Sequence, residues 1–314
     1  MKTGAFIIPT GIGASIGGYA GDASKWARKL AEKCKLIVNP NVVNAACFSG
    51  ITNNMLYVEG YTLDDFFKGK CKLIESHNNK IGVVFDKAIP QNILNVHINT
   101  INAVKTVYDV NILDYQITTN EVGVEFFIDK SGVSMGNVRN LETIKEAAET
   151  LIKKGCEAIA IVCHFPEEQG DNYANGIGVD PVGGVEAIIS HYISKELQVP
   201  CAHAPAFSDI NITTEIVDSK CSAEYITPTF LPCILIGLNQ APKINNNKGL
   251  GIKDLDFIVV PHNSLGGIPV LEATKNNIKI YAIAENKTVL NVTEKKFNTK
   301  CDIINTYEEL LELI

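Results

Sequence analysis

The sequence predicts an α/β fold: largely parallel sheets with flanking helices, arranged as two Rossmann-like lobes with a ligand crevice between them. Short β-branched runs alternate with helical patterns along the chain, as in parallel sheets covered by helices. The 314 residues are long for one hydrophobic core and sufficient for two. We expect an N-terminal lobe over residues 1–120 and a C-terminal lobe over 121–314, or one integrated unit.

Alternating and clustered apolar residues predict strands and helices in order along the chain. The predicted strands are residues 5–8, 36–38, 55–58, 81–85, 112–118, 122–128, 158–163, 233–238, 257–260 and 278–283. Apolar spacings of three and four predict helices over 23–31, 141–152 and 185–193. Asp180 before Pro181 predicts the start of the third helix, and Thr306 with Glu309 forms a capping box for a C-terminal helix.

Composition excludes several classes of protein. Hydrophobic residues make up 46% of the chain and charged residues 20%, with a mean hydropathy of +0.09, which is typical of a folded globular protein. The net charge is −7 without a block of like charges, so we expect no nucleic-acid partner. No membrane span or signal peptide is recognisable, which predicts a cytoplasmic protein without membrane contact; a homo-oligomer stays open. Nine scattered cysteines without a Cys-x-x-Cys pair favour reduced thiols.

Two long loops interrupt the alternation of elements. Residues 166–184 follow a predicted strand and contain glycines with Asp, Asn and Tyr, so a lid over a ligand and a plain surface loop are both open. Residues 239–255 are rich in Asn and Lys and read as a solvated connection.

A glycine-rich turn over residues 9–22 follows the first predicted strand and precedes a predicted helix. Backbone amides in this context bind phosphate or carboxylate, although the glycines could instead serve only a tight turn. The candidate ligand-binding residues are Thr10, Gly11, Gly13, Ser15, Gly17 and Gly18, with Asn41 after the second strand. The glycine spacing departs from Gly-x-Gly-x-x-Gly and no acidic residue ends the second strand, so NAD(P) is only an alternative and no cofactor is expected.

Two further positions are candidates for holding an anion. Ser264, Gly266 and Gly267 form a second glycine turn before a predicted helix, where a helix cap is the alternative role. Arg139 is one of only two arginines and could clamp a carboxylate or phosphate.

Candidate catalytic groups lie where predicted strands end. Cys201 and His203 are two residues apart and share a face of an extended segment, so the imidazole could lower the pKa of the thiol. Glu59 follows another strand and could transfer protons or simply cap a turn. His164 and His262 also follow strands, but no ligand spacing demands a metal, and we expect none.

Segments throughout the chain resemble an uncharacterised family defined as a domain of unknown function. They are residues 9–23, 39–46, 56–61, 178–191, 200–206 and 230–238. The resemblance implies one integrated unit and transfers no reaction. In the family pattern an arginine replaces His164 and His262 has no counterpart, which leaves as candidates Cys201, His203, Glu59, Asp22 and Asp180.

The leading functional hypothesis is a metal-independent enzyme acting on a small anionic metabolite, phosphorylated or carboxylated. Cys201, His203, Glu59 and Asp180 would supply acid–base or nucleophilic chemistry, as in a racemase, isomerase, lyase or hydrolase. A nicotinamide-dependent oxidoreductase and a non-catalytic small-anion-binding protein are the alternatives.

Overall fold

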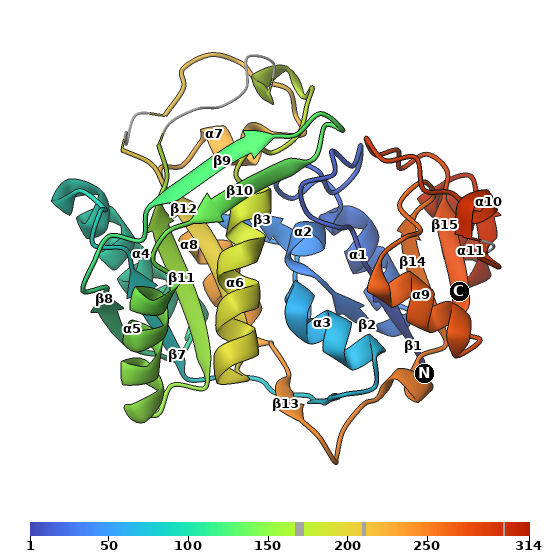
Figure 1. The fold of residues 1–314 in the computed structure, drawn as a ribbon, viewed down its shortest axis with the longest axis horizontal. Coiled ribbons are helices and arrows are strands. Elements are labelled where there is room, and N and C mark those ends of the chain that lie inside the picture. Colours follow the sequence, from blue (N-terminus) through green and yellow to red (C-terminus); the bar gives the residue numbers. More distant parts are fainter. Residues whose placement is uncertain (167–172, 209–211, 298) are drawn as a thin grey trace.

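Two parallel sheets form the framework of the computed structural model, which describes residues 1–166, 173–208, 212–297 and 299–314 (Figure 1). The six-stranded sheet has the order β16 (Asp302–Ile304), β15 (Lys279–Ile283), β14 (Phe257–Pro261), β1 (Lys2–Phe6), β2 (Cys34–Val38) and β5 (Met55–Tyr57). The four-stranded sheet has the order β12 (Cys201–Ala206), β11 (Ala158–His164), β7 (Ile81–Phe85) and β8 (Ile112–Ile117). All pairings within both sheets are parallel, so the predicted α/β class with largely parallel sheets is confirmed, while the ligand crevice between lobes stays a prediction.

Three small antiparallel pairs complete the strands. They are β9 (Val124–Ile128) with β10 (Ser134–Val138), β6 (Lys72–Ile74) with β13 (Lys243–Asn245), and β3 (Asn44–Ala45) with β4 (Phe48–Ser49). The β9–β10 hairpin crosses the front of the molecule between the two sheets (Figure 1). The predicted solvated connection over 239–255 contains β13.

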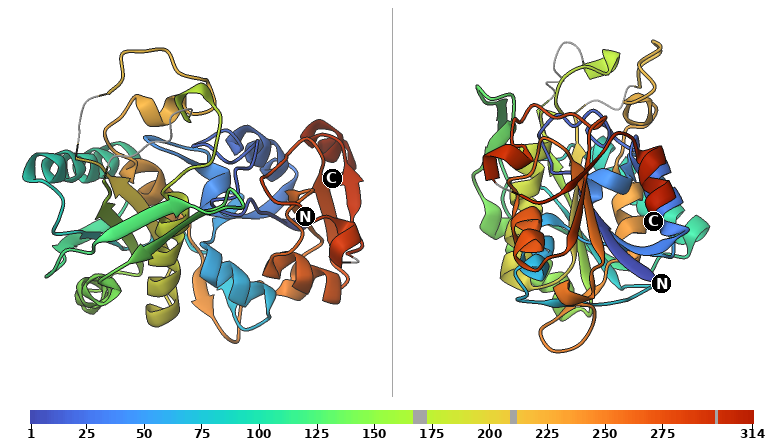
Figure 2. Two further views of the ribbon diagram at one scale, coloured as in Figure 1. Left: turned by 45° about the horizontal axis from the view of Figure 1, so that its top comes forward. Right: turned by 90° about the vertical axis from the view of Figure 1, so that its right-hand side faces the viewer.

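Helices cover both faces of each sheet, because successive strand residues point to opposite faces and both sets are apolar. On the six-stranded sheet, α1 (Ser24–Ala31) and α11 (Tyr307–Leu313) cover one face, and α3 (Gly60–Phe67) and α9 (Ile268–Lys275) the other (Figure 2, right). On the four-stranded sheet, α4 (Gln91–Tyr108) and α8 (Leu231–Asn239) lie opposite α5 (Leu141–Lys153) and α6 (Gly183–Leu197). The short helices are α2 (Pro40–Val43), α7 (Ser222–Tyr225) and α10 (Glu294–Phe297).

The two sheets do not divide the chain at residue 120. The six-stranded sheet takes its strands from both ends of the chain, since β14 pairs with β1, whereas the four-stranded sheet is built from residues 81–206. Both termini therefore lie in the same lobe (Figure 1). One buried cluster runs from Trp26 and Tyr307 beside the first sheet to Phe85 and Ile93 beside the second, so the lobes share a core.

The predicted strands form with small shifts at their ends, except for residues 233–238, which lie in α8. That prediction was wrong because a short apolar run does not distinguish a buried strand from a buried helix. Pro232 lies in the first turn of α8, and the Leu231 N–H donates to the Thr229 hydroxyl at 3.3 Å. The helix then packs against α4 and against β11 and β12, which bury most of its side chains.

The structure confirms the predicted start of α11 and corrects that of α6. Thr306 caps α11, and its hydroxyl accepts the Glu309 N–H at 3.2 Å, as predicted. Asp180 is not the N-cap of α6, which begins at Gly183 after Val182. The Asp180 carboxylate instead accepts the Val182 N–H at 3.0 Å, which closes a turn ahead of the helix.

The predicted lid and the expected absence of a membrane span can be compared only with the described residues. Residues 167–172 of the predicted lid lie outside the described residues, so the lid stays a prediction. Among the residues that are described, none of the helices is both long and apolar enough to cross a membrane.

Candidate functional site

The main pocket lies where strands of both sheets end, at the carboxyl ends of β2 and β12 and beside the glycine-rich turn after β1. Its volume is about 910 Å³, including the open space at its mouth. It is lined by Gly17, Gly18, Tyr19, Ala20, Pro40, Asn41, Asn44, Ala46, Tyr173, Asp180, Pro181, Val182, Glu186, His203, Ala204, Pro205, Phe207, Glu224, Phe230, Cys233 and Ile234. In parallel α/β folds this end of the sheet is where ligands bind.

Ser134 joins three segments around the pocket. Its backbone N–H donates to the Gly11 carbonyl at 2.8 Å, its hydroxyl donates to the Pro181 carbonyl at 2.8 Å, and the hydroxyl accepts the Gly184 N–H at 3.0 Å. A Cβ on Gly184 would lie 2.2 Å from the Ser134 carbonyl oxygen, so only glycine permits this approach. The β9–β10 hairpin thereby fixes the start of α6 against the glycine-rich turn.

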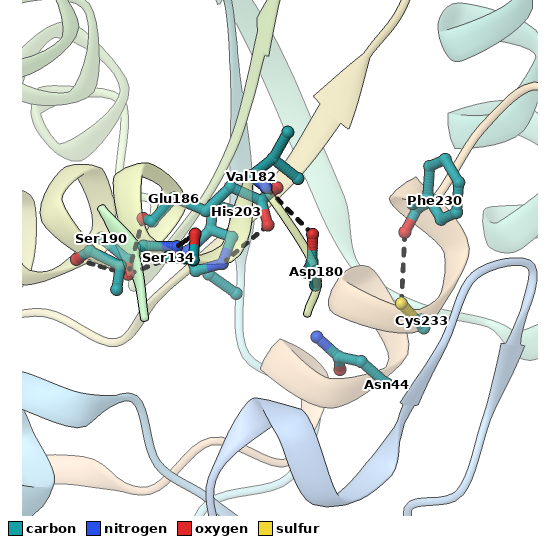
Figure 3. Close-up of polar contacts among 12 residues, drawn as sticks. Asn44, Ser134, Asp180, Val182, Glu186, Ser190, His203, Phe230 and Cys233 are labelled. Carbon is teal, nitrogen blue, oxygen red and sulfur yellow. Dashed lines mark hydrogen bonds and ion pairs between the residues drawn. The ribbon is translucent and has the colours of Figure 1, made fainter. Parts of the chain in front are cut away.

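A carboxyl group and an imidazole meet in the pocket wall (Figure 3). The Glu186 Oε2 atom, from the first turn of α6, lies 3.6 Å from His203 Nε2 on β12. On the other side of the ring, His203 Nδ1 lies 2.9 Å from the Ser190 hydroxyl, one helical turn beyond Glu186. The hydroxyl fixes the ring orientation and leaves Nε2 facing Glu186.

Burial favours the neutral form of both members of this pair. It raises the pKa of Glu186 well above its usual value, and the nearby carboxyls of Asp180 and Glu224 raise it further. Burial, with a smaller contribution from the His191 ring, lowers the pKa of His203 to about 3. The second carboxyl oxygen of Glu186 is buried and has no hydrogen-bond partner within the described part of the chain.

Further acidic and phenolic groups extend from this pair toward the glycine-rich turn. The Glu224 Oε1 atom accepts the Tyr173 hydroxyl at 3.0 Å and the Ala20 N–H at 3.1 Å. Burial and the Asp180 carboxyl raise the pKa of Glu224 to about 8. Burial also raises the pKa of Asp180. The pocket therefore holds three carboxyl groups in a partly dehydrated environment.

The opposite wall comes from α8 and the β3–β4 hairpin (Figure 3). Cys233 donates its thiol to the Phe230 carbonyl at 3.2 Å, and burial raises its pKa to about 12, so the thiol stays protonated. The Asn44 side chain accepts the Tyr57 hydroxyl at 3.1 Å. Phe207 packs edge-on against Phe230, with 6.2 Å between the ring centres.

A family model for a protein of unknown function, DUF3326, matches residues 3–314 of this chain. The chain belongs to the DUF3326 family. The resemblance inferred from the sequence is thus confirmed. The chain is 36% identical over 317 residues to an uncharacterised lipoprotein of Synechococcus sp., covering 98% of this chain and 88% of that protein. No solved structure matches this DUF3326 chain.

The glycine-rich turn of this DUF3326 protein has its amides engaged by its own side chains. The Gly17 N–H donates to Asp22 Oδ1 at 2.6 Å, the Ile16 N–H donates to Asn286 Oδ1 at 3.1 Å, and Ala20 donates to Glu224. Burial raises the pKa of Asp22 to about 6. Gly11, Gly13 and Gly17 have φ values of 72°, 55° and 85°. Glycine adopts this left-handed backbone conformation most easily, which accounts for its presence at these positions.

The remaining residues of the turn form a smaller neighbouring pocket. Thr10, Gly11 and Gly13 line this space of about 260 Å³, which shares Gly18, Asn41 and Asp180 with the main pocket. These predicted ligand-binding residues are thus brought to the site. Ser15 is turned away, with its hydroxyl donating to the Glu285 carbonyl at 3.1 Å and accepting the Lys287 N–H at 2.8 Å.

Cys201 and Glu59 lie outside the main pocket and line a separate small one with Pro200 and Thr62. Cys201 starts β12 rather than ending it, and burial raises its pKa well above the usual value, so the thiolate is disfavoured. Glu59 caps α3, since its carboxylate accepts the Thr62 and Tyr61 N–H groups at 2.7 and 2.8 Å. Of the predicted catalytic set, the structure brings only His203 and Asp180 to the main pocket.

The second glycine turn and the other single candidates have local roles away from the pocket. The Ser264 hydroxyl donates to the Pro261 carbonyl at 3.1 Å, Gly267 precedes α9 as its N-cap, and the neighbouring Gly266 is exposed. Arg139 forms an exposed ion pair with Glu125 at 3.0 Å. His164 contacts the Ser208 hydroxyl at 2.8 Å, and His262 lies 3.9 Å from a Glu294 oxygen.

Glu186, Glu224 and Tyr173 were not among the sequence candidates. Glu186, Ser190 and Ser194 recur every four residues on the same helical face as Ile189 and Ile193, and this face is buried. Polar residues on an apolar helical face were therefore a usable signal. In the described residues, no group of three or more His, Cys, Asp or Glu side chains is arranged to hold a metal ion.

Proposed function

We propose that this protein is an enzyme that performs acid–base chemistry on a small polar metabolite in the main pocket. The single observation that carries the proposal is the Glu186–His203 pair, 3.6 Å apart in the pocket wall, where burial shifts the pKa of each group toward its neutral form. A neutral carboxyl can donate a proton and a neutral imidazole can accept one, so a paired acid and base face the same space.

The surroundings support a separate role for each member of the pair. Ser190 holds His203 Nδ1, so Nε2 is the atom that takes a proton from the ligand. Glu186 delivers a proton to the ligand and recovers one from the imidazole at the end of the cycle. Isomerases, racemases and lyases all use such a pair, and the proposal covers these reaction classes.

Two sequence hypotheses receive less support from the geometry. A thiol nucleophile at Cys201 would require a buried, protonated group to leave its own small pocket. A dinucleotide at the glycine-rich turn would require amides that now bind Asp22, Asn286 and Glu224. NAD(P) chemistry stays an untested alternative, as does a binding protein without catalysis.

The proposal is tested by hydrogen exchange and conversion of metabolites in D₂O, followed by proton NMR. Purified protein is incubated with a panel of hydroxy, amino and keto compounds, and loss or movement of C–H signals is recorded. We expect Glu186→Gln and His203→Gln each to slow conversion by at least about 100-fold. Glu196→Gln on the exposed side of α6 and the exposed His77→Gln are the matched controls.

The outcomes separate the alternatives. Conversion that persists at the wild-type rate in both pocket variants removes Glu186 and His203 from the chemistry. A compound that binds without any exchange or conversion supports the binding protein instead. A reaction that requires added NAD(P) supports the oxidoreductase.

The cellular location is a separate proposal. The sequence favoured the cytoplasm, whereas the Synechococcus relative is named a lipoprotein, which favours a membrane-attached protein. Cys34, the first cysteine in this sequence, is buried in β2. Fractionation of cells decides between the two: recovery with membranes supports the lipoprotein assignment, and recovery with the soluble fraction supports the cytoplasmic one.

A further inference from the structure

We propose that the ligand of the main pocket carries a protonated amine, which the carboxyl groups of Asp180, Glu186 and Glu224 receive. This inference deepens the proposed function because it names the substrate class of the same pocket. It stands on the charge, the burial and the unused hydrogen-bonding capacity of the lining residues.

The charge of the pocket wall is the first argument. Three carboxyl groups line the pocket, and the described lining residues contain no lysine or arginine. The Lys220 ammonium lies over the Tyr19 ring, 5.8 Å from its centre, and Lys220 does not line the main pocket. An anionic ligand would meet carboxyls with no opposing cation, whereas an ammonium group would lower their raised pKa values and pair with the ionised carboxylates.

The unused acceptor of Glu186 is the second argument. The Glu186 residue is 7% exposed, and its Oε1 atom is buried without a hydrogen-bond partner in the described structure. Buried oxygens of this kind are rare in proteins unless a ligand or water completes them. An ammonium group supplies three N–H donors, enough to reach more than one carboxyl group at a time.

The mutual effect of the carboxyls is the third argument. Asp180 and Glu224 each raise the pKa of Glu186, and Asp180 also raises that of Glu224, so the groups are close enough to repel one another when ionised. A cation among them removes this repulsion. The aromatic rings of Tyr173, Phe207 and Phe230 in the same lining provide apolar walls and electron-rich faces that suit an alkylammonium group.

Matched probes test the charge preference without knowledge of the natural substrate. The first set is ethanolamine, ethylene glycol and glycolate, and the second is 1,4-diaminobutane, 1,4-butanediol and succinate. Binding to the full chain is measured by ligand-detected NMR titration at neutral pH. We expect the amine in each set to bind at least about tenfold more tightly than its diol and its carboxylate.

Variants then locate the binding group. Glu186→Gln keeps the side-chain shape but cannot ionise when an ammonium group binds, so it should weaken amine binding by at least about tenfold and change diol binding by less than about twofold. Asp180→Asn is the second pocket variant, and Glu196→Gln is the exposed control on α6. Circular dichroism verifies that each variant is folded.

The inference is overturned if glycolate or succinate binds as tightly as the amines, if Glu186→Gln and Asp180→Asn leave amine affinity unchanged, or if neither amine binds at about 50 mM. Amine binding that depends on Glu186 without any conversion in D₂O leaves this inference standing and removes the catalytic proposal. Conversion of a neutral or anionic compound that depends on Glu186 and His203 does the reverse.

Discussion

At the scale of single residues, burial controls the protonation of the pocket. Asp22, Asp180, Glu186 and Glu224 all have raised pKa values because the fold separates them from water, and the buried His203 has a lowered one. Neighbouring groups whose pKa values are shifted in opposite directions are typical of acid–base sites. The same pKa shifts make the stability of the protein depend on pH.

Glu224 gives a pH dependence of defined sign. Its pKa is about 8 in the folded protein and about 4.5 when unfolded, so between these values the folded state holds a proton that the unfolded state releases. The stabilisation is complete below about pH 4.5 and is lost as the pH rises toward 8. From about pH 7 to 8, the wild-type Tm should therefore fall more than that of Glu224→Gln.

This window isolates the carboxyl from the histidine. His203 has a folded pKa of about 3, so between pH 7 and 8, above its unfolded value near 6.5, it is mostly neutral in both states and contributes little slope. The exposed Glu308→Gln variant is the control and should follow the wild type. Differential scanning calorimetry measures the change, and identical slopes in Glu224→Gln and the wild type would contradict the assignment.

At the scale of elements, the β9–β10 hairpin positions the start of α6, and with it Glu186. The buried Ser134 makes this connection through the Pro181 carbonyl and the Gly184 N–H. The same strand residue binds the Gly11 carbonyl through its backbone. The hairpin is therefore part of the pocket framework although none of its residues lines the main pocket.

Ser134→Ala should lower the free energy of unfolding by about 1–3 kcal/mol, because it leaves the half-buried Pro181 carbonyl and Gly184 N–H without their partner. Urea denaturation measures this change. Ser131→Ala in the exposed turn of the same hairpin removes only a hydrogen bond to Asp129 and should change stability by less than about 0.5 kcal/mol. Equal losses in the two variants would show that Ser134 has no special role.

At the scale of the whole molecule, the two sheets share one core. Tyr307 near the C-terminus stacks on Trp26, with 5.4 Å between ring centres. It also packs against Phe6, with 5.3 Å between ring centres. The buried cluster that contains these rings continues to Phe85 beside the other sheet. We infer that the lobes unfold together.

A comparison of two probes tests this cooperativity. Trp26 is the single tryptophan, so its fluorescence reports on the six-stranded lobe, whereas far-ultraviolet circular dichroism reports on both lobes. The two urea transitions should coincide in the wild type. In Tyr307→Ala both should shift together, with a loss of about 3 kcal/mol for the deleted ring. A fluorescence transition that separates from the circular dichroism transition would show that the lobes are independent.

The sequence by itself determined the fold class, most strands, the cap at Thr306 and the family. These features depend on local patterns: alternation of apolar residues, side-chain capping and contiguous motifs. It also named His203, Asp180, Asn41 and the glycine-rich turn as candidates, and these lie together at neighbouring pockets because residues after parallel strands meet at one edge of a sheet. The sequence did not reveal the helix α8, since a short and mostly buried apolar run does not distinguish a helix from a strand.

The tertiary structure alone decided which side chains meet. The pairing of β14 with β1 puts both chain ends into one sheet, and no local pattern encodes that pairing. Cys201 and His203 share a strand face, yet only His203 reaches the main pocket, because Cys201 starts β12 and His203 lies nearer its carboxyl end. Glu186 and Glu224 join it from distant segments. The acidic character of the pocket arises from this convergence, because charge density depends on distances in space and not along the chain.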